Sequence, residues 1–151
     1  MPRYASGGVE GLRAYLAANL PSHINTVEAD ESVTLADPDV YRGAEHPAAV
    51  EPLAIEVDSP GHEPEDLIND VEAVDLVVNI VLRVPDADVV AAKQNLRRYV
   101  SALRRCLRAD VTAGGACFDT QPGRTDYAGI GDDGQLVLVA TTAVLMKRHE
   151  N

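Results

Sequence analysis

The sequence predicts an α+β protein: a single twisted, mainly antiparallel sheet of four to five strands, with a short N-terminal helix and one long amphipathic helix packed against it. Two patterns carry this prediction. Residues 74–84 place an apolar side chain at every second position, and residues 88–108 place apolar side chains at helical spacing. The composition agrees, because the chain is 46% hydrophobic but has one Phe and no Trp, so aliphatic side chains must form the core. The 151 residues fit a single domain.

The first expected element is a helix from Val9 to Leu20, where apolar residues follow one another at spacings of three and four. Pro21 disfavours helical geometry in the residue before it, so we expect the helix to end there. A weak strand is predicted near residues 32–36. Residues 37–52 contain three prolines and show no periodicity, which predicts a long surface loop.

The middle of the chain predicts two strands and the long helix. A strand is expected at residues 53–57, followed by an acidic turn or flap at residues 58–66. The run from 71 to 84 predicts a long strand with one buried face. That face consists of Val74, Leu76, Val78, Ile80, Leu82 and Val84. The amphipathic helix follows over about residues 88–108.

The last third of the chain predicts a short strand at residues 116–120, a loop at residues 121–134 and a final strand at residues 135–147. The final strand is apolar on both faces, so it is expected to lie centrally in the sheet or to contact another chain. Val137 and Val139 in this strand are therefore candidate interface residues.

Charge is distributed unevenly along the sequence. The formal net charge is −11, yet residues 1–85 hold 16 acidic and 4 basic side chains, whereas residues 93–108 hold six basic and no acidic ones. Two poles of opposite sign suggest self-association or an ordered assembly. Adaptation to high salt is a competing explanation, because the chain has only two lysines beside its 24 acidic residues.

The basic residues of the long helix form a face separate from its apolar stripe. They are candidate residues for a subunit or partner interface: Lys93, Arg97, Arg98, Arg104, Arg105 and Arg108. A solvated outer face is the plainest interpretation, and contact with an acidic surface of a neighbouring copy is the second. Direct binding of nucleic acid is the third. It is disfavoured because no aromatic residues interleave with the arginines and the rest of the chain is acidic.

The sequence predicts no catalytic, cofactor-binding or metal-binding residues, and therefore no enzyme. The GxGxxG letters at residues 129–134 are interpreted as a turn, since a strand follows them rather than a helix. The four histidines lie far apart, and Cys106 and Cys117 are expected to be reduced structural thiols. A small hydrolase with acidic groups in its loops is a further alternative. With no run of about 18 apolar residues, no membrane partner is expected.

The order of elements resembles that of the tail terminator (tail completion, head–tail joining) proteins of long-tailed phages and related tailed viruses. The resemblance covers most of residues 1–151. It rests on a short helix ending in "NLPSHI", a Pro-rich loop, "LAIEVD", "VDLVVNIVLRV", "NLRRYVSALRRCLRA", a loop around "YAGI" and a final apolar strand.

This resemblance implies a structural virion protein that assembles with itself into a ring, typically a hexamer, in the host cytoplasm and resides in the tail or neck of the virion. The ring caps the tail tube protein, ends its polymerisation and joins the tail to the head–tail connector protein. Genomic DNA would pass through the lumen without specific binding, because acidic walls repel phosphate. The alternative function is that of a nucleic-acid-binding accessory protein which uses the basic helix at residues 93–108.

Overall fold

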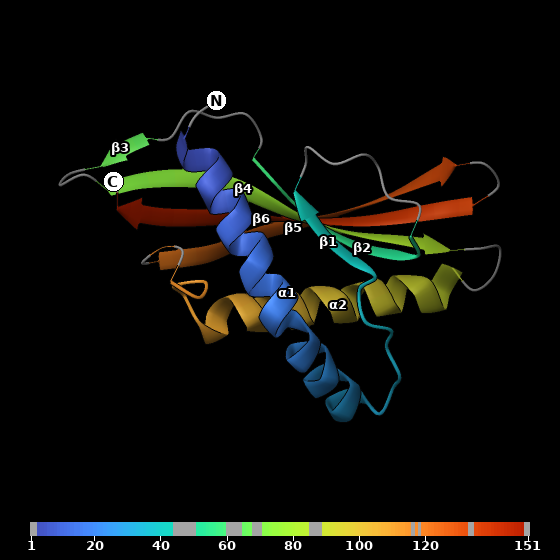
Figure 1. The fold of residues 1–151 in the computed structure, drawn as a ribbon. Coiled ribbons are helices and arrows are strands. Elements are labelled where there is room, and N and C mark those ends of the chain that lie inside the picture. The colour runs from blue at the N-terminus through green and yellow to red at the C-terminus, as the bar shows by residue number, and fades with distance from the viewer. Residues whose placement is uncertain are drawn as a thin grey trace.

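The computed structural model describes residues 3–43, 51–59, 65–67, 71–84, 89–115, 117, 119–132 and 135–149 (Figure 1). Its elements are, in order, α1 (Arg3–Glu31), β1 (Val40–Gly43), β2 (Leu53–Asp58), β3 (Glu65–Leu67), β4 (Val71–Val84), α2 (Val89–Ala109), β5 (Asp119–Asp132) and β6 (Gln135–His149). They form one sheet with two helices, which confirms the predicted α+β class.

The sheet has the strand order β1-β2-β4-β6-β5, and the short β3 pairs with the start of β4. Only β1 and β2 run parallel, so the sheet is mainly antiparallel, as predicted. The two long strands β4 and β6 pair along their whole length, from Val71 opposite His149 to Val84 opposite Leu136. Figure 1 shows the twist: β4 lies above β6 and β5 at the left end of the sheet and below them at the right end.

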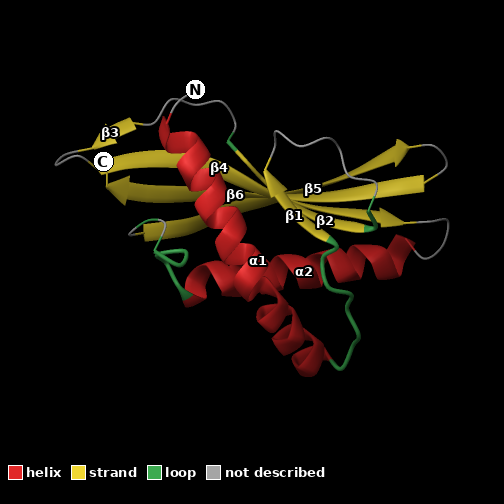
Figure 2. Ribbon diagram, in the orientation of Figure 1, coloured by secondary structure: helices red, strands yellow, loops and turns green. Residues whose placement is uncertain are grey.

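Both helices pack on the same face of the sheet (Figure 2). Helix α2 contacts β4, β5 and β6, while α1 crosses α2 and contacts β1, β2 and β4. The predicted inner face of β4 is confirmed: Val74, Leu76, Val78, Ile80 and Val84 are buried, and Leu82 packs against them partly buried. The final strand is central, between β4 and β5, as one of the two predicted alternatives required.

The predicted end of the first helix at Leu20 is wrong, because α1 continues through Pro21 to Glu31. A proline inside a helix costs about 3 kcal/mol, since its nitrogen donates no hydrogen bond and its ring crowds the preceding turn. Burial of Leu20, Ile24 and Val27 on the same side of the helix offsets this cost. The apolar side chains that repeat at helical spacing on both sides of Pro21 therefore stabilise the helix by more than the proline destabilises it.

Helix α1 ends where Ser32 takes up a left-handed backbone conformation, with φ of 54°. The amide of Val33 then donates to the carbonyl oxygen of Glu28 at 3.1 Å, and the Glu28 carboxylate accepts from the amide of Leu35, also at 3.1 Å. These bonds satisfy groups at the helix end and hold the following segment in an irregular path. The weak strand predicted near residues 32–36 is therefore wrong.

The loop predicted at residues 37–52 is wrong in part, since β1 lies within it and residues 44–50 lie outside the described residues. Strand β1 forms because its backbone pairs in parallel with β2, with Tyr41 opposite Ile55. Asp39 fixes the entry to this pair: its amide donates to the carbonyl oxygen of Leu53 at 2.8 Å, and its carboxylate accepts from the amide of Leu53 at 2.9 Å.

The loop predicted at residues 121–134 is also wrong, because β5 extends from Asp119 to Asp132 and pairs with β6. Pro122 and Gly123 suggested a loop, but they lie at an irregularity of the pairing between Pro122 and Thr125. Strand β5 is an edge strand, where a proline without an N–H and a local bulge are tolerated. Residues 133 and 134 lie outside the described part of the chain.

Candidate interaction surfaces

Helix α2 has the predicted division into an apolar and a basic side. Its buried residues are Ala92, Leu96, Tyr99, Val100, Ala102, Leu103, Cys106 and Leu107. The tyrosine hydroxyl of Tyr99 donates to the carbonyl oxygen of Ala36 at 2.7 Å, which ties α2 to the segment after α1. Burial raises the pKa of Tyr99 to about 12, so the phenol remains a donor over the physiological range. The basic residues divide into two groups of three.

Three of the arginines are engaged within the chain. Arg98 Nε lies 3.1 Å from Glu31 Oε1, and Arg105 Nη1 lies 2.9 Å from Asp30 Oδ2. Both carboxylates belong to the last turn of α1, so the acidic end of one helix meets the basic side of the other. Arg104 Nη1 instead donates to the carbonyl oxygen of Gly123 at 2.7 Å, at the irregular part of β5. These three side chains therefore hold elements of their own chain together.

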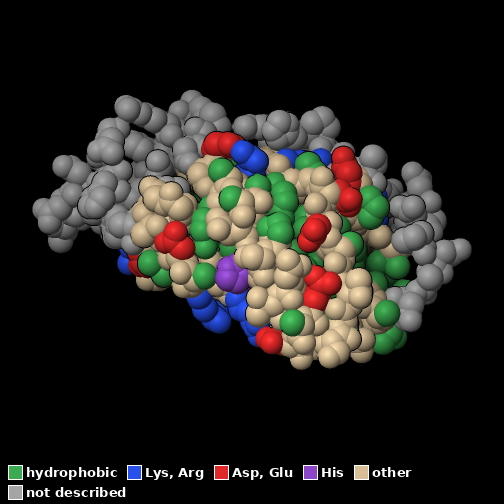
Figure 3. Space-filling model, turned by 60° about the horizontal axis from the view of Figure 1, so that its bottom comes forward, with side chains coloured by type: hydrophobic (Ala, Val, Ile, Leu, Met, Phe, Trp, Pro, Cys, Tyr) green, Lys and Arg blue, Asp and Glu red, His purple; other side chains and the backbone are tan. Residues whose placement is uncertain are grey.

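The other three cations, Lys93, Arg97 and Arg108, form no ion pair or hydrogen bond with any residue that the structure describes. Arg108 lies in the last turn of α2, where a cation interacts favourably with the helix dipole. Lys93 and Arg97 lie in the first half of the helix and line a groove. Figure 3 shows acidic side chains spread over the face that it presents, with Lys and Arg side chains at its lower left margin and along its upper edge.

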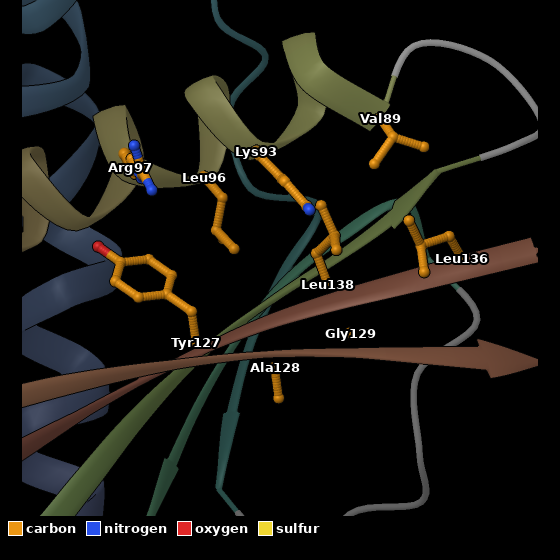
Figure 4. Close-up of a pocket in the computed structure, with 9 residues that line it drawn as sticks. All are labelled: Val89, Lys93, Leu96, Arg97, Tyr127, Ala128, Gly129, Leu136 and Leu138. Atoms are coloured by element: carbon orange, nitrogen blue, oxygen red, sulfur yellow. The ribbon is translucent and has the colours of Figure 1, made fainter.

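The groove, which we call the α2–hairpin groove, lies between the first half of α2 and the β5–β6 hairpin and has a volume of about 370 Å³. Its lining residues are Val89, Lys93, Leu96, Arg97, Tyr127, Ala128, Gly129, Leu136 and Leu138. Figure 4 shows Leu96 pointing from the helix toward the strands, and the ring of Tyr127 reaching up from β5 with its hydroxyl below Arg97. The groove thus combines an apolar floor with two cations.

Val137 and Val139, the other candidate interface residues, lie on the sheet face turned away from both helices, which we call the outer face. Val137 is only 7% exposed and Val139 is half-buried. Val139 lies opposite Val81 of β4, and Ala143 of the same strand lies opposite Val77, so apolar side chains extend across neighbouring strands.

A polar row crosses the middle of the outer face. Thr141 Oγ1 donates to Asn79 Oδ1 at 2.7 Å, and on the next strand Glu56 accepts from Arg42 Nε at 2.9 Å. A hollow of about 360 Å³ lies beside this row, where the irregular part of β5 adjoins β6 and β4, and Ala143 is part of its lining. The outer face is therefore mixed, with apolar rows on both sides of polar pairs whose hydrogen bonds are satisfied.

The two cysteines are thiols rather than partners in a disulfide. Cys106 is buried in the core, where desolvation raises the pKa of its thiol to about 11. A thiol with a raised pKa is a poor nucleophile at neutral pH. The hydroxyl of Tyr15 donates to the carbonyl oxygen of Cys106 at 2.6 Å, which joins α1 to α2 inside the core. These contacts are those of a structural residue.

A metal or cofactor would require ligating side chains that converge. Within the described ranges, no three His, Cys, Asp or Glu side chains come together as ligands for a metal ion. Nor is any helix of the described residues both long and apolar enough to cross a membrane. Comparison with protein-family models and with curated protein sequences finds no match to this chain.

Proposed function

We propose that the chain is the subunit of a ring that caps the tail tube of a virus, ends its polymerisation and joins the tail to the head-side connector. The observation that carries the proposal is the outer face of the sheet. Val77, Val81, Val139 and Leu145 lie there half-buried, and neither helix covers them. Apolar side chains that extend over adjacent strands, with no covering layer among the described residues, mark a surface that contacts another protein.

The architecture suits a structural subunit. The strands β4 and β6 pair over 14 residue positions and form a continuous wall, with both helices behind it. A sheet that is covered by helices on one face only can present its other face to a neighbouring subunit, while its hydrophobic core remains buried beneath the helices. A repeated head-to-tail contact between identical subunits generates a ring when the rotation closes. The order of β2, β4, α2 and a final apolar strand, which resembles that of tail terminator proteins, supports the same assembly, whereas α1 does not end at "NLPSHI" and "YAGI" lies in β5 rather than in a loop.

The charge of the chain supports a lumen through which DNA passes without adhering. At a formal net charge of −11, the surface as a whole repels phosphate, and the repulsion is screened over about 10 Å at 0.1 M salt. Three of the six cations of α2 are engaged by Asp30, Glu31 and the backbone of Gly123. The alternative function, nucleic-acid binding through this helix, therefore has fewer available cations than the sequence suggests.

Negative-stain microscopy of the purified protein, alone and mixed with tail tubes, tests the proposal. We expect rings of uniform diameter, found at tube ends when tubes are present. A duplex-DNA shift assay over a series of salt concentrations accompanies it, and we expect no shift at physiological ionic strength. Particles that never form rings or bind tube ends would contradict the proposal, and a salt-dependent shift would favour the nucleic-acid alternative.

A further inference from the structure

We infer that the α2–hairpin groove receives the acidic β3 segment of a second copy of this chain, so that copies join head to tail. The inference rests on the proposed function in that it specifies one contact between neighbouring ring subunits.

The groove has two properties of a protein-binding site. Among the described residues, four large hydrophobic side chains are exposed, and two of them, Val89 at 38% and Tyr127 at 50%, line the groove. A third, Val90, is 67% exposed and follows Val89 directly. Concentration of exposed apolar side chains in one place marks an interaction surface.

The charge of the groove selects an acidic occupant. Lys93 and Arg97 are the only charged residues among the nine described residues that line it, and neither has an ion-pair partner in the described chain. An apolar floor beside two cations fits a peptide segment that carries an apolar side chain next to carboxylates. Arginine and lysine near such carboxylates form charge-assisted hydrogen bonds and disfavour other partners.

The chain itself contains a segment of this kind. Between residues 58 and 75 the sequence has seven acidic residues and no Lys or Arg. Strand β3 lies within this stretch and reads Glu65, Asp66, Leu67, two carboxylates followed by one large apolar residue. The sequence of β3 therefore matches both properties of the groove.

The β3 segment cannot reach the groove of its own chain. It pairs with β4 around Glu72, whereas Leu138 of the groove lies opposite Leu82, ten residues further along the same strand. At about 3.4 Å per residue this separates the two sites by roughly 34 Å. Figure 1 shows β3 at the left end of the sheet and the end of the β5–β6 hairpin at the right. A β3 segment bound in this groove must therefore come from another copy, and the contact is head to tail.

Reciprocal charge reversal tests this contact. The groove variant carries Lys93→Glu and Arg97→Glu, and the strand variant carries Glu65→Lys and Asp66→Lys. In sedimentation velocity over a concentration series, each variant alone is expected to self-associate at least about tenfold more weakly than the parent, because like charges then face each other. Mixed in equal amounts, the two variants retain one intact contact, between the β3 segment of the groove variant and the groove of the strand variant, and they restore the other contact with its charges exchanged. The mixture is therefore expected to self-associate again, with the two variants alternating head to tail.

The matched control carries Arg108→Glu and Arg124→Glu, which lie outside the groove. Each replacement changes the charge by −2, so this control and the groove variant both go from −11 to −15. The control is expected to associate like the parent, and thermal melts should show that all variants fold. A mixture that remains monomeric, a parent that does not self-associate, or a control as weak as the groove variant overturns the inference. A groove variant that still forms rings and caps tubes normally would overturn this inference but not the proposed function. Head-to-tail association of the parent chain without tube capping would overturn only the proposed function.

Discussion

Arg105 of α2 and Asp30 in the last turn of α1 form an ion pair within one chain, with 2.9 Å between Nη1 and Oδ2. The attraction between acidic and basic regions that the sequence suggested between copies is thus partly used inside each copy. Both side chains remain substantially exposed, at 44% and 56%. The pair links the last turn of α1 to α2, and the apolar contacts between the two helices provide the stability.

The Arg105–Asp30 pair should therefore contribute little to folding. In a double-mutant cycle with Arg105→Ala and Asp30→Ala, we expect a coupling free energy of about 0.2–1 kcal/mol that falls as salt is added, because water and ions screen exposed charges. Denaturant unfolding at low and high salt measures it. A coupling several times larger, or one insensitive to salt, would show that the pair is more strongly desolvated than its exposure indicates.

Replacing Pro21 tests the continuity of α1. Pro21→Ala should raise the free energy of unfolding by about 1–3 kcal/mol, since alanine restores the missing amide donor and removes the steric conflict inside the helix. Thermal or denaturant unfolding measures the change. Pro38→Ala, in the irregular segment after α1, is the control and should have no such stabilising effect. A loss of stability on Pro21→Ala would indicate that the helix ends at Leu20 after all.

Two buried tyrosine hydroxyls predict opposite effects of the same substitution. Tyr99→Phe removes the bond to the carbonyl oxygen of Ala36 and should cost about 0.5–1.5 kcal/mol. The hydroxyl of Tyr41 is buried with no hydrogen-bond partner among the described residues. Tyr41→Phe should leave stability unchanged or raise it by up to about 1–3 kcal/mol, because an unsatisfied polar group leaves the interior. Equal losses from both substitutions would mean that Tyr41 has a partner.

The raised pKa of Cys106 predicts a loss of stability at high pH. Burial raises the pKa of this thiol in the folded chain from its ordinary value of 9.0 to about 11, so the unfolded chain loses its proton first. The contribution of this thiol to the free energy of unfolding is fully present below about pH 9, and it is lost as the pH rises through the pKa of the thiol in the folded chain. Denaturant unfolding between pH 8 and 10.5 should therefore show a steeper decline for the parent than for Cys106→Ala. Parallel declines would assign the effect to the tyrosines instead.

The outer face should matter for assembly rather than for folding. Val139→Thr replaces a methyl group on that face by a hydroxyl and should change the free energy of unfolding by no more than about 0.5 kcal/mol. Buried in a dry contact, the same hydroxyl costs about 1–3 kcal/mol, which weakens association by a factor of about 5 to 160. Val78→Thr, on the inner face of β4, is the control and should destabilise the fold itself. Ring yield and unfolding are measured for both, and a ring yield unaffected by Val139→Thr would show that the outer face is not the contact.

The sequence predicted the elements whose periodicity is strong. The alternation from Val74 to Val84 and the apolar stripe of α2 each reflect burial on one face. In the structure those faces are the ones that pack in the core. Three errors occurred at Pro21, β1 and β5, where composition suggested a break in regular structure. In each of these three cases pairing or packing with residues distant in sequence decided the outcome, and such contacts are not visible in a local stretch of sequence. The fourth error, the strand expected near residues 32–36, has a local cause in the hydrogen bonds of Glu28 at the end of α1.

The candidate interface residues show the same division. Their location on one side of α2 followed from helical spacing alone, but the separation of Arg98, Arg104 and Arg105 from Lys93 and Arg97 did not. It depends on where α1 ends and on where β5 runs, and both elements differ from the prediction. The α2–hairpin groove was likewise missed, because the stretch around Tyr127 was interpreted as a loop. Only the pairing of β5 with β6 places that ring beside α2.

The growth of tail tubes in the presence of the purified chain tests whether the chain caps them. Tube protein polymerises while the chain is added in increasing amounts, and electron microscopy records the length of the tubes and the structure at their ends. We expect growth to stop, with a ring at one end of each tube, and we expect capped tubes to join head-side connectors. Tubes that continue to grow with unmodified ends, at a saturating concentration of folded chain, would contradict the proposed function.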